Sequence, residues 1–386
     1  MPNGTTNLID NFLLKAAKLG ASDIHIEPGK DSTTVRFRID GLLNKYTELD
    51  SSLHPSAISR IKVMSDMDIS EQRLPQDGRV RVRVSGNEID LRISTIPTLH
   101  GEKACVRLLP RDSIRLKLEE LGMTAEQLAA YSSIISKSSG IIIVTGPTGC
   151  GKTTTLYSTL NRISSPGNNI VTIEDPVEYE IGGVNQIQVN VKSGLTFARG
   201  LRSILRQDPD IIMVGEIRDT ETAEIAVHAA LTGHLVFSTL HTNDAASAMT
   251  RLSDMGVEPF LISSSIIGVL AQRLLRMICP DCKETYKPSK EALESLGLTL
   301  QDGPFYKGRG CPKCQDVGYK GRVGIFELIT VNEELRKKIL GNTSSEELKR
   351  VATEAGTIPL KEEGIARAKE GVTTVEEVLR VTQEEF

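Results

Sequence analysis

A glycine-rich segment, GPTGCGKT at residues 146–153, constrains the fold of this chain more than any other feature. It matches the pattern GxxxxGK[ST], and it lies between an apolar run at residues 141–144 and a helical pattern at residues 154–163. Strand, loop and helix in this order are the context in which the pattern binds phosphate, so a chance glycine-rich turn is disfavoured. The glycines let backbone N–H groups point at phosphate oxygens, and the helix N-terminus adds a favourable dipole.

The motif also assigns expected roles to individual side chains. Lys152 is expected to reach the β- and γ-phosphates of a nucleotide, and the hydroxyl of Thr153 is expected to hold Mg²⁺. The sequence therefore predicts a P-loop ATPase. The residues expected to bind the nucleotide are Gly146, Pro147, Thr148, Gly149, Cys150, Gly151, Lys152, Thr153 and Thr154.

Short apolar runs rich in β-branched residues alternate with helical stretches from residue 140 onward. These runs lie at residues 141–144, 170–173, 211–214 and 235–238. Each is typical of a buried parallel strand. Their alternation with helices predicts an α/β domain in which helices cover both faces of the sheet.

ATP hydrolysis also requires a side chain that positions the attacking water. Glu174 follows one predicted strand and Glu216 follows another, so both are expected at the strand ends where ligands of open α/β sheets bind. The sequence leaves open which of the two is the main catalytic carboxylate, and a solvated acid is the alternative for either alone. Gly215 stands where an aspartate commonly precedes the second acid, which makes this an atypical Walker B segment.

Three histidines lie near these predicted strands. His241 follows the strand at residues 235–238, a position that suits a sensor of the γ-phosphate. His228 lies within a predicted helix, where a structural role is the better interpretation, and His234 lies just before the strand.

The regions on either side of the α/β domain have different patterns. Helical spacing at residues 8–19 is followed by alternating runs at residues 23–27 and 34–40, and by a hairpin pattern at residues 79–93. These patterns predict a small α+β domain with a largely antiparallel sheet. Charge rises and periodicity weakens in the next segment, which we interpret as a linker.

The chain is expected to turn helical after Ser263, to pass through two cysteine pairs and to end in helices. Ser344 with Glu347, and Thr373 with Glu376, predict capping boxes at the starts of two of these helices. The expected domains are residues 1–110, a linker at 111–120, a core at 121–275, a cysteine subdomain at 276–330 and a helical subdomain at 331–386.

Composition bounds the function and the location. The chain of 386 residues has 46 Lys and Arg against 50 Asp and Glu, a net charge of −4, whereas nucleic-acid-binding proteins usually carry a basic surplus. No apolar run is long enough to span a bilayer, and no signal peptide is evident at the start. We therefore expect a cytoplasmic protein.

Four of the six cysteines form two CxxC pairs, Cys279 with Cys282 and Cys311 with Cys314. In a reducing compartment this pattern indicates a metal site before it indicates disulfides. Two such pairs can close a tetrahedral four-sulfur zinc site, which has no open position and therefore stabilises structure. Two disulfides are the alternative, and Cys105 and Cys150 are expected to be bystanders.

Several segments occur in an order that resembles one family. They are the phosphate loop, TIEDPVE at residues 172–178, RQDPDIIMVGEIRD at 206–219, and TGH and STLHTN at 232–234 and 238–243. Together they look like the Asp box, Walker B segment and His box of the secretion ATPases, which power bacterial type II secretion and type IV pilus assembly. The resemblance covers nearly the whole chain, starting from SDIHIEP at residues 22–28.

The resemblance implies a homohexamer whose subunits each join an N-terminal α+β (PAS-like) domain to a RecA-like P-loop motor domain. It also implies a small zinc-binding helical subdomain that holds the tetracysteine site. Arg92 and Arg107 match the positions from which arginines of the N-terminal domain would clamp the phosphates, although strand arginines on a solvated face are the alternative. Second-rank candidates for the same role are Arg202, Arg206 and Arg218.

The resemblance also implies ATP, Mg²⁺ and zinc as cofactors, and a location at the inner face of the bacterial inner membrane. The implied partners are an inner-membrane platform protein and the cytoplasmic domain of a membrane assembly protein. Family members usually carry a further N-terminal domain that docks on this machinery, and this chain begins close to the motif at residues 22–28. We therefore expect either a truncated chain or a short relative.

Three functional hypotheses remain after this comparison. Retraction ATPases characteristically lack the tetracysteine module, so its presence favours secretion or pilus assembly, and the runs PFLISSS, LAQR and CPDCK after residue 258 favour type II secretion over pilus assembly. A nucleic-acid translocase is the second hypothesis, weakened by the acidic charge and the absence of tryptophan. A nucleotide-gated scaffold with little turnover is the third.

Overall fold

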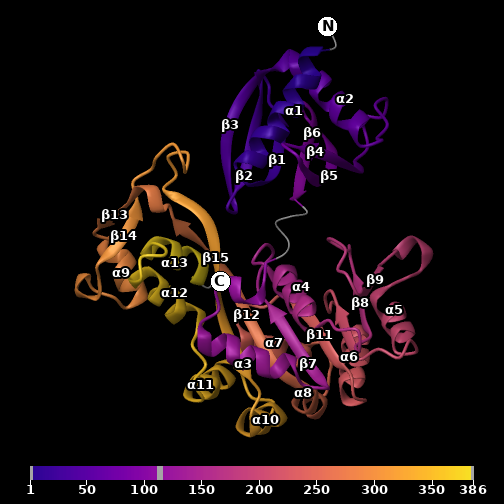
Figure 1. The fold of residues 1–386 in the computed structure, drawn as a ribbon, viewed down its shortest axis with the longest axis vertical. Coiled ribbons are helices and arrows are strands. Elements are labelled where there is room, and N and C mark those ends of the chain that lie inside the picture. Colours follow the sequence, from indigo (N-terminus) through magenta and orange to yellow (C-terminus); the bar gives the residue numbers. More distant parts are fainter. Residues whose placement is uncertain (1–2, 111–115, 384–386) are drawn as a thin grey trace. The chain divides into compact units, whose positions relative to one another are not determined.

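The structure is a computed structural model that describes residues 3–110 and 116–383 (Figure 1). The chain divides into two compact units, Met1–Arg115 and Leu116–Phe386. Of the expected linker at residues 111–120, residues 111–115 lie outside the described residues. The part that follows belongs to the second unit, because Leu118 lies in a short 3₁₀ helix (Leu118–Glu120) and is buried in the core.

The described residues of the first unit form a six-stranded antiparallel sheet in the order β3-β2-β1-β6-β5-β4 together with the α-helices α1 and α2. One face of the sheet is apolar, because alternate residues of its strands pack with residues of both helices in a single core. The expected helix, alternating strands and hairpin are therefore confirmed. The elements are α1 (Asn3–Lys18), β1 (Ala21–Pro28), β2 (Ser32–Ile39), β3 (Leu42–Asp50), α2 (His54–Met64), β4 (Gln76–Val84), β5 (Asn87–Thr98) and β6 (Gly101–Pro110).

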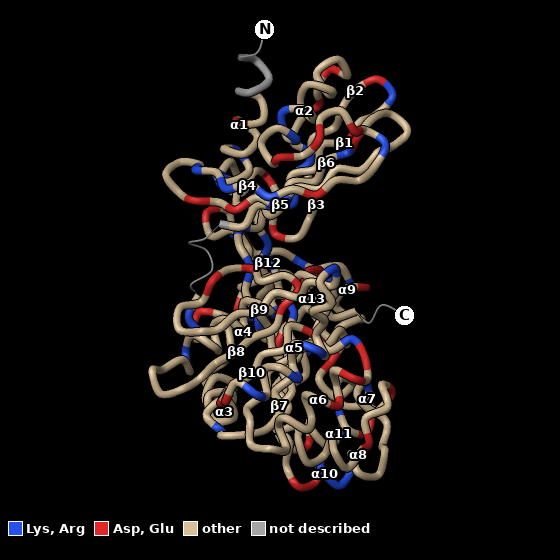
Figure 2. Tube along the Cα trace, turned by 90° about the vertical axis from the view of Figure 1, so that its right-hand side faces the viewer, with Lys and Arg blue, Asp and Glu red and all other residues tan. Residues whose placement is uncertain are grey.

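Charged residues of both signs occur along the strands of the first unit (Figure 2), and the ion pairs among them lie on the face opposite the apolar core. Ion pairs cross between neighbouring strands: Arg36 lies 2.7 Å and Lys103 2.8 Å from Glu27, and Arg107 lies 2.9 Å from Asp23. Alternation of apolar and charged residues along each strand thus separates a core face from a charged face.

The second unit is built on a seven-stranded sheet in the order β15-β12-β7-β11-β10-β8-β9. The four predicted strands are β7 (Gly140–Thr145), β8 (Ile170–Glu174), β10 (Ile211–Val214) and β11 (Leu235–Leu240), and they pair in parallel. Two apolar clusters, one on each side of the sheet, hold its helices in place. The predicted α/β fold is therefore confirmed.

Further elements of the core complete this unit. They are α3 (Ala125–Ile135), α4 (Lys152–Ile163), β9 (Val184–Gln188), α5 (Phe197–Ile204), α6 (Thr220–Leu231), α7 (Ala245–Asp254) and α8 (Pro259–Ser265).

The helical interpretation after Ser263 is wrong for the segment that follows α8. Residues Ile266–Ile278 form β12, a long strand that pairs with β7 in parallel and with β15 (Tyr319–Thr330) in antiparallel. β12 therefore runs through the boundary expected at residue 275, and β15, expected in the cysteine subdomain, belongs to the core sheet. Pairing on both sides favours the strand, which is buried along most of its length.

The cysteine region contains strands as well as a helix. β13 (Lys283–Tyr286) and β14 (Phe305–Gly308) form a two-stranded antiparallel sheet, and α9 (Lys290–Leu296) lies between them in sequence. The chain then ends in helices, as expected: α10 (Glu333–Leu340), α11 (Ser345–Glu354), α12 (Leu360–Lys369) and α13 (Val375–Thr382). Among the described residues, no helix has both the length and the apolar character needed to cross a membrane.

One of the two expected helix caps is shifted by a residue. Ser344 caps α11 by accepting a hydrogen bond from the N–H of Glu347, but the Glu347 carboxylate pairs with Lys338 and Arg350, so only the N-cap half of the predicted capping box is confirmed. At α13 the cap is Thr374, which accepts from the N–H of Glu377, and not Thr373 with Glu376. The reason is that the hydroxyl of Thr373 is buried and donates to the carbonyl of Arg276.

Candidate nucleotide-binding site

The phosphate loop lies between the end of β7 and the start of α4, in the expected strand–loop–helix order. Gly146 has a φ of +144°, and a Cβ at this position would lie 2.6 Å from the carbonyl oxygen of Gln272 and 2.7 Å from the sulfur of Cys150. Gly151, with a φ of +94°, is the N-cap residue of α4. The glycines are therefore required both by backbone conformation and by close approach.

Lys152 is folded back onto the loop that contains it. Its Nζ donates to the carbonyl of Gly146 at 2.6 Å and to the carbonyl of Pro147 at 3.1 Å. Burial lowers the pKa of Lys152, whereas the nearby carboxylate of Glu216 raises it. Thr153 is exposed in the first turn of α4. A cation and a free hydroxyl therefore stand at a helix N-terminus, a combination that suits a phosphate with its metal ion.

Glu216 and His241 lie together at neighbouring strand ends, after β10 and β11. The Nε2 atom of His241 is 3.8 Å from Oε2 of Glu216, and the guanidinium of Arg218 pairs with Oε1 of the same carboxylate. Burial and the charge of Lys152 lower the pKa of His241, so its imidazole is neutral near pH 7. The structure thus brings a carboxylate, a neutral histidine and an arginine to the same edge of the sheet as the phosphate loop.

Glu174 has a different environment, although it also ends a strand. It is 4% exposed, and its carboxylate accepts hydrogen bonds from the hydroxyl of Tyr157, from Thr172 at 2.6 Å and from Gln186 at 3.2 Å. Burial, followed by the charge of Glu174, raises the pKa of Tyr157. These contacts tie β8 to α4, the helix that begins at the phosphate loop.

The candidate arginines fall into separate groups. Arg92 and Arg107 lie directly opposite each other on β5 and β6 of the first unit, and Arg107 pairs with the buried carboxylate of Asp23. In the second unit, Arg202 pairs with Glu221, and Arg206 donates to the carbonyl of Arg202. Of the three second-rank candidates, Arg218 is the one that contacts a strand-end carboxylate proposed for catalysis.

Two residues of β12 that the sequence analysis did not single out support the loop. Gln272 is 2% exposed; its amide donates to the carbonyl of Cys150 at 2.7 Å and accepts from the hydroxyl of Thr155 at 2.8 Å. Arg273 donates to the carbonyl of Asn243 at 2.7 Å, in the segment that follows His241. β12 therefore holds both the phosphate loop and the segment after β11. In the sequence, the one feature that marked Gln272 and Arg273 was that they belong to the LAQR run used for the family resemblance.

Replacement of Gln272 by alanine is expected to weaken nucleotide binding by about tenfold. It leaves the carbonyl of Cys150 without its donor, and an unsatisfied buried group costs about 1–3 kcal/mol. Titration with a fluorescent ATP analogue and thermal unfolding measure the two effects. Alanine at Gln301, whose side chain is exposed, is the matched control. Equal affinities of the Gln272 and Gln301 variants would contradict the supporting role.

The four cysteines of the two CxxC pairs form one cluster. Their sulfur atoms lie within 4.8 Å of one another, with separations of 3.9 Å for Cys279 and Cys311, 3.8 Å for Cys282 and Cys314 and 3.7 Å for Cys311 and Cys314. Sulfur ligands in a tetrahedron with Zn–S bonds of ~2.3 Å are ~3.8 Å apart, whereas a disulfide requires ~2.05 Å. The cluster therefore fits a metal ion and not two disulfides.

Backbone donors complete this cluster. The N–H groups of Cys311 and Gly318 lie 3.2 Å and 3.3 Å from the sulfur of Cys314, where they would stabilise a thiolate. Cys105 and Cys150 lie outside the cluster, as expected. Four sulfur ligands leave no open coordination position, so a metal ion here would have a structural role.

The phosphate loop, the strand-end carboxylate and the α/β sheet define a P-loop nucleotide-binding protein. The chain belongs to the Type II/IV secretion system protein family, whose model matches residues 3–380.

Curated relatives include proteins of two bacterial machines. The chain is 54% identical over 367 residues to the type IV pilus assembly ATPase PilB of Thermus thermophilus. The aligned region covers 94% of this chain and 41% of that protein. It is 51% identical over 379 residues to the type II secretion system protein E of Pseudomonas aeruginosa, covering 98% of this chain and 75% of that protein. The type II secretion system ATPase E of Vibrio cholerae is 50% identical, with coverage of 98% and 75%.

Solved structures with the same fold include an ATPase and a pilus retraction motor. The Legionella pneumophila ATPase DotB superposes with a TM-score of 0.72 at 23% identity, over 97% of this chain and 94% of that chain. The pilus retraction motor PilT with bound ADP superposes with a TM-score of 0.67 at 28% identity, over 98% and 97%. The predicted family and the predicted α/β fold are therefore confirmed.

Proposed function

We propose that this chain hydrolyses ATP with Mg²⁺ and that the hydrolysis powers a type II secretion machine by assembling pilin-like subunits. The observation that carries the proposal is the placement of Lys152, Glu216 and His241 at one edge of the parallel sheet. Lys152 and the loop N–H groups would bind the β- and γ-phosphates, and Thr153 would hold Mg²⁺. His241, neutral near pH 7, would contact the γ-phosphate as a hydrogen-bond donor.

Glu216 is proposed as the carboxylate that positions the attacking water, in preference to Glu174. The side chain of Glu216 is 16% exposed, and its charge reaches Lys152, so a water molecule between it and a bound phosphate is sterically reasonable. The carboxylate of Glu174 is already engaged by three side-chain donors. Its proposed role is to hold α4, and with it the phosphate loop, against β8.

Arginines are proposed to supply the remaining positive charge to the nucleotide. Arg218 is proposed to act through Glu216, which it contacts, and Arg92 and Arg107 are proposed to neutralise phosphate charge. An arginine that neutralises developing charge in phosphoryl transfer accounts for about 10³–10⁵ in rate. In keeping with the family to which the chain belongs, we propose a homohexamer as the active form, in which neighbouring subunits help to preorganise these groups.

Ring formation makes the specific ATPase activity depend on protein concentration. Activity per chain is expected to rise steeply as subunits assemble, because an unassembled site is poorly preorganised. Steady-state hydrolysis measured alongside light scattering over a range of concentrations tests this expectation. A constant specific activity across the assembly transition would rule out ring-dependent catalysis. Added DNA is expected to leave the rate unchanged, and stimulation by DNA would favour a translocase.

Type IV pilus assembly is the second candidate, because the chain is as similar to a pilus assembly ATPase as to type II secretion proteins. Both machines would place the protein in the cytoplasm, at the inner face of the inner membrane, in contact with a membrane platform protein. The Lys152→Ala variant, placed in the chromosome of the source bacterium, separates the two. Loss of secreted enzymes with normal pili supports type II secretion, and loss of pili with normal secretion supports pilus assembly.

A further inference from the structure

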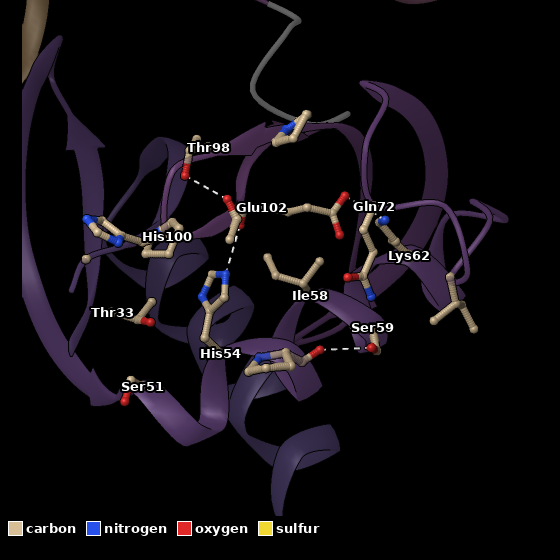
Figure 3. Close-up of a pocket in the computed structure, with 16 residues that line it drawn as sticks. Thr33, Ser51, His54, Ile58, Ser59, Lys62, Gln72, Thr98, His100 and Glu102 are labelled. Carbon is tan, nitrogen blue, oxygen red and sulfur yellow. Dashed lines mark hydrogen bonds and ion pairs between the residues drawn. The ribbon is translucent and has the colours of Figure 1, made fainter. Parts of the chain in front are cut away.

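A carboxylate on β15, Glu327, has different surroundings from two other buried acids of the structure. Glu102 lies 2.6 Å from the ammonium of Lys62 in the first unit, where Figure 3 draws both side chains, and Glu377 lies 2.6 Å from Arg276. The two oxygens of Glu327 instead accept hydrogen bonds from backbone N–H groups. The side chain is 2% exposed. Because burial of a charge is costly unless hydrogen bonds compensate it, this arrangement indicates a specific role.

The two N–H groups belong to the first residues of two helices. One oxygen of Glu327 accepts from Ala245 of α7 at 2.9 Å, and the other accepts from Leu360 of α12 at 3.3 Å. The first turn of a helix has N–H groups without partners in the helix and carries the positive end of its dipole, so both helices favour a carboxylate here. One side chain of β15 therefore joins α7 to α12.

Packing alone does not require an acid at this position. Residues two apart along a strand share a face, and Glu327 lies between Ile325 and Ile329, which are buried in an apolar cluster of the core. Burial raises the pKa of Glu327, whereas the two N–H donors lower it. An apolar side chain would fill the same space, but it would leave the N–H groups of Ala245 and Leu360 without this acceptor.

Residues 242–245 connect His241 to the start of α7 and are anchored to the sheet. The N–H of Thr242 donates to the hydroxyl of Thr145, the last residue of β7, at 3.0 Å. The contact with β12 described above holds the carbonyl of the next residue. Glu327 holds the N–H at the end of the segment. The half-exposed side chain of His241 therefore lies at one end of a segment that β7, β12 and β15 fix together.

We propose that Glu327 is a positioning residue for ATP: by fixing the start of α7 it places His241 for contact with the γ-phosphate, and it ties that contact to α12. The inference rests on the role proposed above for His241. Glu327 acts through residues 242–245 and not by contact with the nucleotide. Because ADP lacks the γ-phosphate, a change at Glu327 is expected to weaken binding of ATP more than binding of ADP.

Isothermal titration calorimetry of the full chain with Mg²⁺ and either AMP-PNP or ADP tests the proposal, because AMP-PNP keeps a γ-phosphate but resists hydrolysis. In Glu327→Gln the amide nitrogen would face one of the two N–H groups. The affinity for AMP-PNP relative to ADP is therefore expected to fall by about three- to tenfold.

Glu363→Gln is the matched control for this measurement. Glu363 is also buried, and its carboxylate accepts from the N–H of Phe326 on β15 and from the amide of Gln127. Its substitution is expected to lower stability and to leave the ratio of the two affinities unchanged. An equal fall of the ratio in Glu327→Gln and Glu363→Gln would mean that general destabilisation, and not positioning, causes the effect.

A double-mutant cycle separates this inference from the proposed role of His241. His241→Ala is expected to lower the ratio of AMP-PNP to ADP affinity by about tenfold. Addition of Glu327→Gln to that variant is expected to lower it little further, because both changes remove the same contact. An unchanged ratio in His241→Ala would reject the γ-phosphate role of His241. A lowered ratio in His241→Ala, with no effect or an additive effect of Glu327→Gln, would reject the positioning role alone.

Hydrogen exchange of the wild type, resolved to single amides, tests the same connection even if Glu327→Gln does not fold. Relative to ADP, AMP-PNP is expected to slow exchange at Ala245 and at Leu360 together, because one carboxylate accepts from both N–H groups. Slower exchange at Ala245 alone, or at neither residue, would contradict the proposal.

Discussion

ATP turnover is expected to fall about 10²–10⁴-fold when Glu216 is replaced by glutamine, with little change in nucleotide affinity. Glutamine keeps the size of the side chain but cannot accept a proton from the attacking water. The exposed edge of the Glu216 carboxylate and its closeness to His241 and Lys152 are the reasons for this assignment. Single-turnover hydrolysis with pre-bound ATP separates the chemical step from binding.

Glu174→Gln is the matched control, because it makes the same change at the other strand-end acid. Its carboxylate accepts from Tyr157, Thr172 and Gln186, so the substitution is expected to disturb a buried network and lower stability by about 1–3 kcal/mol. Its turnover is expected to fall much less than that of Glu216→Gln. If Glu174→Gln were the inactive variant and Glu216→Gln retained activity, the roles assigned to the two acids would have to be exchanged.

Removal of the zinc ion that we propose for the tetracysteine cluster is expected to have the second large effect. Structural zinc in small domains contributes about 10–16 kcal/mol of apparent binding free energy, and here the cluster joins the turn after β12 to the segment before β15. Cys282→Ser is therefore expected to lose the metal and to unfold the region of β13, α9 and β14. Metal analysis by mass spectrometry and hydrogen exchange of residues 283–308 measure both consequences.

The control for this experiment is Cys105→Ser, which changes a cysteine outside the cluster. It is expected to keep a full complement of metal and normal exchange protection. Because four sulfur ligands leave no catalytic position, chelation is expected to slow ATP hydrolysis only in step with the loss of structure. A Cys282→Ser protein that retained one zinc per chain and native protection would contradict the four-ligand site.

Local pattern was sufficient for much of this fold. The parallel strands β7, β8, β10 and β11 are short apolar runs, and their order with the phosphate loop and α4 follows from the sequence alone. In the first unit, the strict alternation of β4 and β5 and the turn between them predict a hairpin. In each of these elements, the pattern of apolar and polar residues that identifies a strand is complete within a few consecutive residues.

β12 could not be predicted in this way. Its residues, IIGVLAQRLLRMI, form a long apolar run with several good helix formers, and such a run is ambiguous between a buried helix and a buried strand. Its pairing with β7 and β15 decides in favour of the strand. The role of Gln272 was hidden for the same reason, since its bond to Cys150 joins residues 122 positions apart.

For two pairs of residues, the acids Glu174 and Glu216 and the threonines Thr373 and Thr374, the sequence offers equivalent candidates that only their burial in the structure distinguishes. Glu174 and Glu216 have equivalent places after strands, and only their surroundings separate a hydrogen-bonded buried carboxylate from a partly exposed one. The segment TTVEE at residues 373–377 offers two overlapping capping patterns. The structure uses Thr374, because the hydroxyl of Thr373 is buried and already donates to the carbonyl of Arg276.

Steady-state hydrolysis of Mg-ATP by the assembled wild type, compared with Lys152→Ala at the same concentration, tests the central claim most directly. The claim predicts turnover by the wild type that vanishes in the variant and on removal of Mg²⁺, because Lys152 and the metal ion bind the phosphates in the proposed mechanism. Turnover that is equal in the two proteins, or absent from an assembled wild type, would contradict the assignment of this chain as a motor ATPase.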